Sequence, residues 1–361
     1  MSREIGYNMH DIIKFKIITD SKVNLLKDIN FFLSYFETDN VSSPDIILKI
    51  GKFEPSNEGC FLVDHKYYIK DNYFYCKDQE GRAKWEVEIF GFEEGQAMIN
   101  FHGRVLGLEQ VLIPDYLAQN LILRPLIELK LLERGYTVIH GLGIEKKGDA
   151  YIFAARGGAH KTRLAMDAIR CGKYRLIGDD RILLGKDRQV LSYPLFYNLV
   201  MFRAERLRDE HISSFLDKVK MARYISSRHN RKNTNKIFAD RSKLKKMFLV
   251  ARKEGYDNIS QRRINLDDAV IRLVRSNQME MTSSGISSLG FVHFLKYMLA
   301  YCYVFPESEI GGYWGDLRYS LKETLIDLPL YEIELPYKYT QSILINLANS
   351  YDGGGIINEI I

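Results

Sequence analysis

The hydrophobic and polar positions between Asp45 and Gly107 alternate in short runs that are separated by turn residues. Among these runs are D-I-I-L-K-I-G-K-F, C-F-L-V-D-H-K-Y-Y-I, Y-F-Y-C-K-D-Q-E-G-R and A-K-W-E-V-E-I-F-G-F, which are rich in Tyr, Phe, Val and Ile. A period of two residues with these side chains is typical of half-buried β-strands. The pattern predicts an antiparallel β meander, and we expect residues 1–112 to form a β-rich N-terminal domain.

The spacing becomes helical between Pro114 and Arg134. A wide apolar stripe is formed there by Leu117, Leu121, Leu123, Leu126, Leu129 and Leu132. Gly135 supplies a stop signal. We expect one helix, bent near Pro125 because proline lacks the N–H that a helix interior uses. The runs Y-T-V-I-H and A-Y-I-F-A-A follow, and the E-K-K-G-D turn between them predicts two buried strands.

The rest of the chain predicts a second domain at residues 113–361. The stretch from Arg203 to about Arg275 loses strand alternation, so we expect a basic helical insertion at about 201–275. Within it, Ser226 to Lys236 has almost no apolar residue and predicts a mobile loop. Gly290 to Phe305 predicts a buried helix, and L-P-L-Y-E-I-E-L-P predicts a strand before a final helix. The expected fold class is α/β, or α+β for the chain as a whole.

The composition limits the number of domains, the location and the cysteine chemistry that we expect. The chain has 361 residues, of which 46% are hydrophobic, which is enough for one or two globular domains. No run of 18 apolar residues occurs, so we expect no membrane span and a cytoplasmic location. The four cysteines are far apart and form no C-x-x-C pair, which favours buried free thiols over disulfides or a zinc site.

Positive charge is concentrated in one segment. The net charge of the chain is +5, yet Met201 to Asn265 alone holds 18 Lys and Arg against 7 Asp and Glu. A solvated helical face is the interpretation we favour for this segment. Recognition of an acidic or phosphorylated substrate is the second interpretation. Nucleic-acid binding comes last, since R-H-N-R-K and R-S-K-L-K-K lack interleaved aromatic residues.

The stretch A-A-R-G-G-A-H-K-T-R-L-A, Ala154 to Ala165, resembles a phosphate loop that has lost two glycines. The motif G-x-x-x-x-G-K-[ST] wraps phosphates with backbone N–H groups and supplies a lysine and a metal-binding hydroxyl. Aligned on Lys161 and Thr162, this sequence has Ala155 and His160 at the glycine positions. The local order is nevertheless a predicted strand, a glycine-containing loop and a predicted helix, which would present free N–H groups to an anion.

An aspartate pair downstream supports the same interpretation. A helix from Lys161 to Cys171 rises about 1.5 Å per residue, and a strand from Tyr174 to Asp179 returns at about 3.3 Å per residue. The two lengths match, so Asp179 and Asp180 are expected beside the loop. There one carboxylate can hold Mg²⁺ while the other faces an acceptor hydroxyl. The alternative is that K-T begins an ordinary helix and D-D is a solvated turn.

Three blocks in this order resemble the HPr kinase/phosphorylase family, whose catalytic domain is grouped with phosphoenolpyruvate carboxykinases. They are V-I-H-G-L-G-I at 138–144, G-G-A-H-K-T-R-L-A at 157–165 and C-G-K-Y-R-L-I-G-D-D-R-I-L-L at 171–184. The likeness covers about residues 115 to 200. The resemblance implies that the nucleotide-binding residues are Arg156, Gly157, Gly158, Ala159, His160, Lys161 and Thr162.

The resemblance also implies separate roles for the acidic and basic groups. One aspartate of the pair would assist proton transfer while the other helps to hold Mg²⁺. We assign Asp179 to the proton and Asp180, with Thr162, to Mg²⁺, and Lys161 and His140 would complete the catalytic group. For His140, a core histidine that bonds to backbone is an equally good interpretation. The implied activity is ATP- and Mg²⁺-dependent transfer of phosphate to a hydroxyl, on a protein Ser or Thr or on a small metabolite. Members of the family form oligomers, so the resemblance leaves a homo-oligomer open, and the sequence itself shows no interface signature.

The departures from the motif leave a second function open. His160 replaces the glycine before the lysine, where a side chain either crowds the phosphate or donates an extra hydrogen bond to it. The alternative function is therefore a nucleotide-sensing scaffold without chemistry. The intact K-T and D-D pairs favour the kinase, since a scaffold would have no use for a second carboxylate.

Overall fold

A computed structural model describes residues 3–19, 33–81, 83–105, 116–161, 164–165, 174–194, 238–255, 259–282 and 289–336. Over these residues the chain is a β-rich mixed α/β fold with two large mixed sheets. It divides into two compact units: Met1–Arg134 with Gln278–Leu317, and Gly135–Asn277 with Arg318–Ile361. The sequence predicted two domains that are each one uninterrupted segment, divided after residue 112. In the structure, each unit combines two separate segments of the chain.

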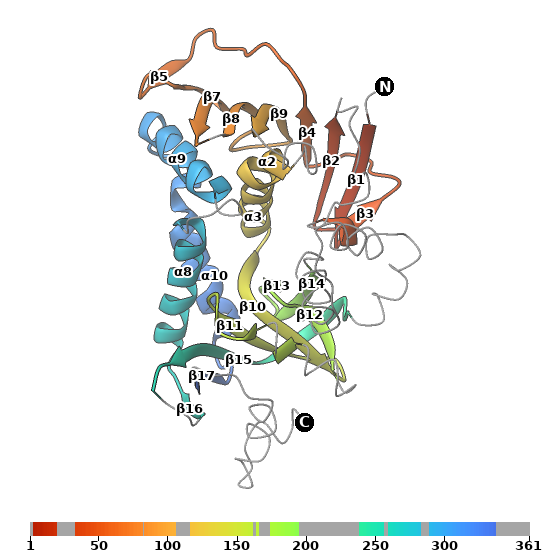
Figure 1. Cartoon of the computed structure of the whole chain (residues 1–361), viewed down its shortest axis with the longest axis vertical. Helices are drawn as coiled ribbons and strands as arrows, with labels where there is room; N and C mark the ends of the chain where they lie inside the picture. The colour runs from red at the N-terminus through yellow and green to blue at the C-terminus, as the bar shows by residue number, and fades with distance from the viewer. Residues whose placement is uncertain are drawn as a thin grey trace, which may run out of the picture. The chain divides into compact units, whose positions relative to one another are not determined.

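The first unit is built on a nine-stranded sheet in the order β3-β1-β2-β4-β9-β8-β7-β6-β5 (Figure 1). Its strands are β1 (Arg3–Met9), β2 (Ile13–Thr19), β3 (Glu37–Thr38), β4 (Ile46–Ile50), β5 (Phe61–Val63), β6 (Tyr67–Lys70), β7 (Tyr73–Glu80), β8 (Ala83–Phe90) and β9 (Ala97–Val105). The predicted antiparallel meander is confirmed from β5 to β9. β4 differs, because it pairs parallel with both β2 and β9. A short 3-10 turn, Ser34–Phe36, precedes β3.

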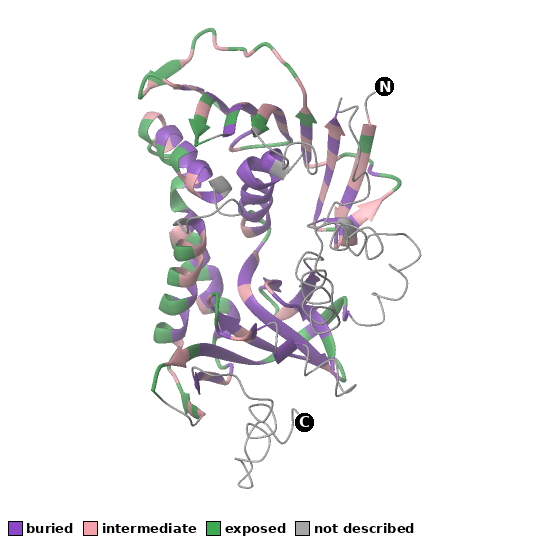
Figure 2. Ribbon diagram, in the orientation of Figure 1, coloured by how far each residue is buried: buried purple, intermediate pink, exposed green. Residues whose placement is uncertain are grey.

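The helix predicted before Gly135 is present and contains a π-helical segment. It runs through α2 (Tyr116–Ala118), the π segment η2 (Gln119–Leu123) and α3 (Arg124–Glu133). Pro125 cannot donate to the carbonyl four residues earlier, so the wider π turn comes directly before it. The helix predicted at Gly290 to Phe305 is present as α9 (Leu289–Val304), but it is not buried throughout, because Leu299 and Tyr303 are exposed. Figure 2 shows α3 almost entirely buried.

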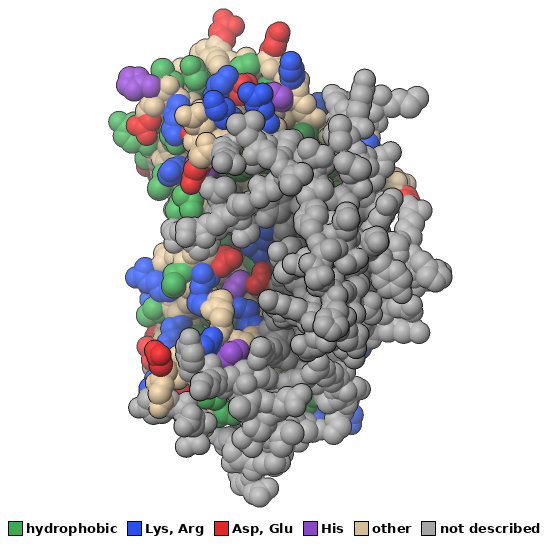
Figure 3. All heavy atoms as spheres, in the orientation of Figure 1, with side chains coloured by type: hydrophobic (Ala, Val, Ile, Leu, Met, Phe, Trp, Pro, Cys, Tyr) green, Lys and Arg blue, Asp and Glu red, His purple; other side chains and the backbone are tan. Residues whose placement is uncertain are grey.

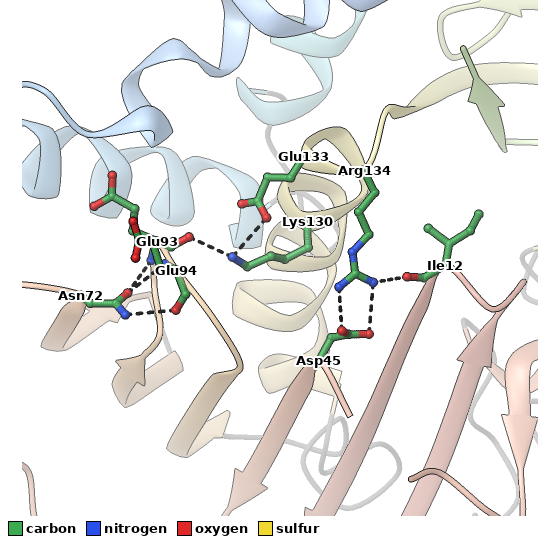
Figure 4. Close-up of polar contacts among 8 residues, drawn as sticks. All are labelled: Ile12, Asp45, Asn72, Glu93, Glu94, Lys130, Glu133 and Arg134. Carbon is green, nitrogen blue, oxygen red and sulfur yellow. Dashed lines mark hydrogen bonds and ion pairs between the residues drawn. The ribbon is translucent and has the colours of Figure 1, made fainter. Parts of the chain in front are cut away.

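Polar contacts join the end of α3 to the sheet of the same unit (Figure 4). Arg134 Nη2 lies 2.6 Å from Asp45 Oδ1, and its Nη1 donates to the carbonyl of Ile12. Burial raises the pKa of Asp45, but the hydrogen bond and charge of Arg134 outweigh it and lower the pKa below the ordinary value. Lys130 Nζ donates to the carbonyl of Glu93 at 3.0 Å. The C-terminal turn of α3 is therefore held by two basic side chains.

The second unit contains an eight-stranded sheet in the order β11-β10-β13-β14-β15-β17-β16, with β12 paired to β10. Its strands are β10 (Tyr136–Lys146), β11 (Asp149–Ala155), β12 (Arg175–Gly178), β13 (Arg181–Gly185), β14 (Gln189–Tyr193), β15 (Arg241–Lys253), β16 (Ser260–Arg263) and β17 (Leu330–Pro336). β11 also pairs with β15, so β11, β10, β13, β14 and β15 form a closed ring of pairings. The helices α8 (Leu266–Thr282) and α10 (Tyr313–Leu325) each pass from one unit to the other, and a 3-10 turn, Glu309–Gly312, leads into α10.

The helical prediction for 201–275 is wrong over residues 241–263. β15 and β16 occupy this part of the segment, and helix begins only at Leu266. Ser242 and Leu244 are buried between exposed basic residues, which is the two-residue period of a strand. The abundance of Lys and Arg hid that period, because these residues occupy the exposed positions 241, 243 and 245 and also the buried position 246. β15 is stabilised by pairing with strands on both of its edges.

Several other predictions can be placed. The hairpin of β10 and β11 and the strand β17 follow the predicted order. The loop at Ser226–Lys236, most of the helix from Lys161 to Cys171 and the C-terminal helix lie outside the described residues. Cys60, Cys76 and Cys302 are free thiols, as predicted, but of these three only Cys76 is buried. Within the part of the chain that the structure describes, no helix is long and apolar enough to cross a membrane.

Candidate phosphate site

The loop of interest leaves the carboxyl end of β11. β11 runs parallel to β15, with Ala155 opposite Val250, so the ends of both strands meet at one edge of the sheet. The chain turns through Arg156 to His160, and helical backbone starts at Lys161, where the N–H of Leu164 donates to the carbonyl of His160 at 3.0 Å. This confirms the predicted order of strand, loop and helical turn.

Two residues of this loop adopt left-handed backbone. Gly158 has φ +82° and His160 has φ +59°. Glycine takes this conformation without strain, whereas a residue with a Cβ does so at a cost of about 1 kcal/mol. His160 thus has the kind of backbone for which the phosphate-loop motif uses glycine.

Lys161 is buried beneath the loop, with 8% of its surface exposed. Its Nζ donates to the carbonyls of Ala155 at 2.7 Å and Arg156 at 3.2 Å, and lies 3.1 Å from Nε2 of His140. An ammonium carries three donors, and three acceptors surround this one. The positive charge is thereby placed at the point where the loop begins and ends.

His140 links the lysine to the aspartate pair. It lies on β10, and its Nε2 is 3.5 Å from Asp180 Oδ1 as well as 3.1 Å from the lysine. The backbone adds a further link, because the N–H of Gly141 donates to the carbonyl of Asp180 at 3.0 Å. Nε2 can accept a hydrogen bond from the ammonium or donate one to the carboxylate, so this imidazole can hold a proton between the two groups.

The aspartates interrupt the pairing of one edge of β10. β12 and β13 both pair with β10, and Asp179 and Asp180 lie between them. Asp179 is 6% exposed and therefore buried, whereas Asp180 is partly open to solvent. Gly178 makes this arrangement possible, since a Cβ there would lie 2.1 Å from the carbonyl oxygen of Arg181.

Sequence reasoning missed Arg252, which approaches the loop from β15. Its Nη1 donates to the carbonyl of Gly158. On α8, the carbonyl of Ser276 accepts a hydrogen bond from Arg156 Nη1 at 3.2 Å. Had 241–253 been recognised as a strand parallel to β11, its last residues would have been expected at the loop, since parallel strands end at the same edge.

The structure thus brings together His140, Lys161 and Asp180 through direct contacts, with Gly157, Gly158, Ala159 and His160 in the same loop. Asp179 is adjacent in sequence, and Thr162 lies outside the described residues. No group of three His, Cys, Asp or Glu side chains that could hold a metal occurs among the residues described. Mg²⁺ in nucleotide sites is commonly held by one or two carboxylates together with phosphate oxygens and water, so Asp180 fits that donor set.

Comparison with known proteins does not extend this description. No protein-family model matches the chain, and no curated protein matches it at a significant level. On the face drawn in Figure 3, the described basic, acidic and hydrophobic side chains are interspersed. The residues of the site itself therefore carry the functional argument.

Proposed function

We propose that this protein is an ATP- and Mg²⁺-dependent phosphotransferase similar to HPr kinase, which transfers a phosphoryl group to a hydroxyl. The observation that carries the proposal is the chain of contacts from Lys161 through His140 to Asp180 at the phosphate-loop-like turn. A cation, an imidazole and a carboxylate are groups that such chemistry uses, and here they come from the residue after the β11 loop, from β10 and from the turn between β12 and β13.

Lys161 would neutralise the charge of the bound phosphates. Its ammonium donates to two loop carbonyls, Ala155 and Arg156. Phosphate oxygens are stronger acceptors than carbonyls because they are charged. A small movement of the side chain would exchange carbonyl for phosphate oxygen, and its burial would strengthen the attraction by excluding water.

Asp180 is the residue we assign to Mg²⁺, with the hydroxyl of Thr162 as its sequence-predicted companion. When bound, the metal would neutralise charge on the phosphate oxygens. The contact between Asp180 and His140 supports this assignment, because it fixes the carboxylate on the side of the site where Lys161 lies.

Asp179 would accept the proton of the acceptor hydroxyl, a role that rests on the resemblance. In the transfer, the hydroxyl oxygen forms a bond to the γ-phosphorus, the bond from that phosphorus to its bridging oxygen breaks, and ADP leaves. The acceptor would be a protein Ser or Thr or a small metabolite. Positioning and charge neutralisation would supply most of the rate enhancement.

The experiment that tests this function is calorimetric titration of ATP, ADP and pyrophosphate with Mg²⁺ into wild-type protein and Lys161→Met. Methionine keeps the unbranched apolar stem and removes the charge. We expect binding to wild type and a loss of at least about tenfold in the variant. Lys130→Met is the matched control, since that buried lysine lies in the first unit and donates to the carbonyl of Glu93, in the loop between β8 and β9. Failure of wild type to bind any of the three ligands would rule out the proposal.

A nucleotide-sensing scaffold without chemistry is the second candidate. The observation in its favour is His160, a bulky residue with left-handed backbone at a position where the motif has glycine. Both candidates bind nucleotide, but only the kinase consumes it. ATP consumption with and without candidate hydroxyl acceptors distinguishes them.

A further inference from the structure

Arg252 reaches the loop from a strand that the phosphate-loop motif does not include. It lies two residues beyond Val250, the residue opposite the last residue of β11. Its Nη1 donates to the carbonyl of Gly158 and lies 3.5 Å from the point where a Cβ of that glycine would be. The guanidinium is therefore packed directly against the most exposed part of the loop.

The peptide between Gly158 and Ala159 is held at both ends. Its carbonyl accepts from Arg252, and its N–H, on Ala159, donates to the carbonyl of Arg156 at 3.4 Å. Arg156 is itself fixed through Nη1 to Ser276. A peptide restrained in this way cannot rotate freely, so the direction of the neighbouring N–H groups is set by Arg252.

We propose that Arg252 is a positioning residue that holds the loop in its phosphate-binding shape and adds a second positive charge above it. The inference rests on the proposed function. Arg156, Lys161 and Arg252 place three cationic side chains around the loop, and the carboxylate of Asp180 contacts His140, which in turn contacts Lys161. That balance suits an anion with several negative charges, so recognition would be directed at the di- or triphosphate chain of a nucleotide.

The test is titration of Mg²⁺ with ATP and of pyrophosphate into Arg252→Met, Arg252→Lys and a matched control, Lys253→Met. Lys253 lies beside Arg252 on β15, and its Nζ is 3.4 Å from Glu334 on β17. We expect Arg252→Met to weaken both ligands by about tenfold or more, because a charge-assisted donor is lost. Arg252→Lys keeps one donor and the charge, so it should bind within about threefold of wild type.

The outcomes separate the two proposals. Wild type that binds neither ligand overturns the function, and the role of Arg252 with it. Wild type that binds, with Lys161→Met impaired and Arg252→Met unchanged, overturns the role of Arg252 alone. If Arg252→Met does not fold, Arg252→Gln replaces it and should show the same weakening, because it removes the charge. An unchanged affinity in that variant overturns the inference.

Discussion

Gly178 shows how a single residue shapes the candidate site. A Cβ at this position would lie 2.1 Å from the carbonyl oxygen of Arg181, and backbone atoms cannot yield as a flexible side chain can. The glycine lets β12 continue directly into Asp179 and Asp180 beside β10. The I-G-D-D sequence is therefore restricted by packing as well as by chemistry.

We expect Gly178→Ala to destabilise the protein by about 2–3 kcal/mol, through the clash with the carbonyl of Arg181. The measurement is the midpoint of urea unfolding. Gly157→Ala is the control, since no heavy atom lies within 4 Å of a Cβ there, and its midpoint should match wild type. Equal midpoints for the two variants would show that the turn is less restrained than its geometry indicates.

Single substitutions also distinguish the roles assigned to Asp179 and Asp180. Asp179→Asn should lower turnover far more than ATP affinity, whereas Asp180→Asn should weaken Mg²⁺-dependent ATP binding, because one residue is assigned to the proton and the other to the metal. The measurement is kcat together with the ATP dissociation constant at several Mg²⁺ concentrations. Equal losses of ATP binding in both variants would mean that Asp179, like Asp180, is a metal ligand.

At the scale of elements, α9 is joined to β7 by a buried histidine. His293 Nδ1 lies 3.5 Å from Asp78 Oδ2, and its Nε2 lies 2.5 Å from Glu80 Oε2. Lys66 Nζ contacts the same oxygen of Asp78 at 3.0 Å. Burial raises the pKa of Asp78, but hydrogen bonds from His293 and Lys66 outweigh it and lower the pKa well below the ordinary value.

This lowered pKa gives the stability a defined pH dependence. The contribution of Asp78 is fully present above the pKa of about 3.9 that an unfolded aspartate has, and it is lost as the pH falls toward the folded pKa. Asp78→Asn should cost about 2 kcal/mol at pH 7, and the difference from wild type should shrink below pH 4.

Urea midpoints from pH 7 to pH 3 measure this effect. Glu86→Gln is the matched control, because Glu86 on β8 pairs with Lys77 on β7, the strand that also carries Asp78. The side chain of Lys77 is largely exposed, and such pairs contribute about 0–1 kcal/mol to stability. A difference between Asp78→Asn and wild type that stays constant down to pH 3 would contradict the linkage.

At the scale of the whole molecule, the first unit is completed by a segment from late in the chain. Residues 278–317 belong with residues 1–134. The hydroxyl of Tyr297 on α9 accepts from Trp85 Nε1 at 2.9 Å, and Tyr301 accepts from the N–H of Asn72 at 2.9 Å. Phe294 is also buried there. The sheet of this unit thus depends on a helix that follows most of the second unit in sequence.

A fragment of residues 1–134 should therefore show no cooperative unfolding, because its apolar face would be open to water. The same fragment joined to residues 278–317 by a flexible linker should regain a cooperative transition. Thermal unfolding followed by near-ultraviolet circular dichroism measures both. A sharp transition in the short fragment alone would show that α9 adds little to this core.

The limits of prediction follow from the range of the interactions. Local patterns identified the meander, the helix before Gly135 and the strand and loop before Lys161, since hydrophobic period and turn residues act over a few positions. The strand at Arg241–Lys253 was mistaken for helix because its alternation was hidden by Lys and Arg. Arg252 was missed for the same reason, and the role of His160 as a left-handed residue could not be foreseen from its identity.

What the sequence determined by itself is the set of local elements and the chemistry available at the loop: a lysine, a histidine and two carboxylates at fixed spacings. What only the tertiary structure decided is which of them meet. His140, Lys161 and Asp180 are brought together by the pairing of β10 with β11, β12 and β13, and Arg252 joins them because β15 runs parallel to β11. Strand pairing across long separations depends on the whole core, and no short pattern encodes it.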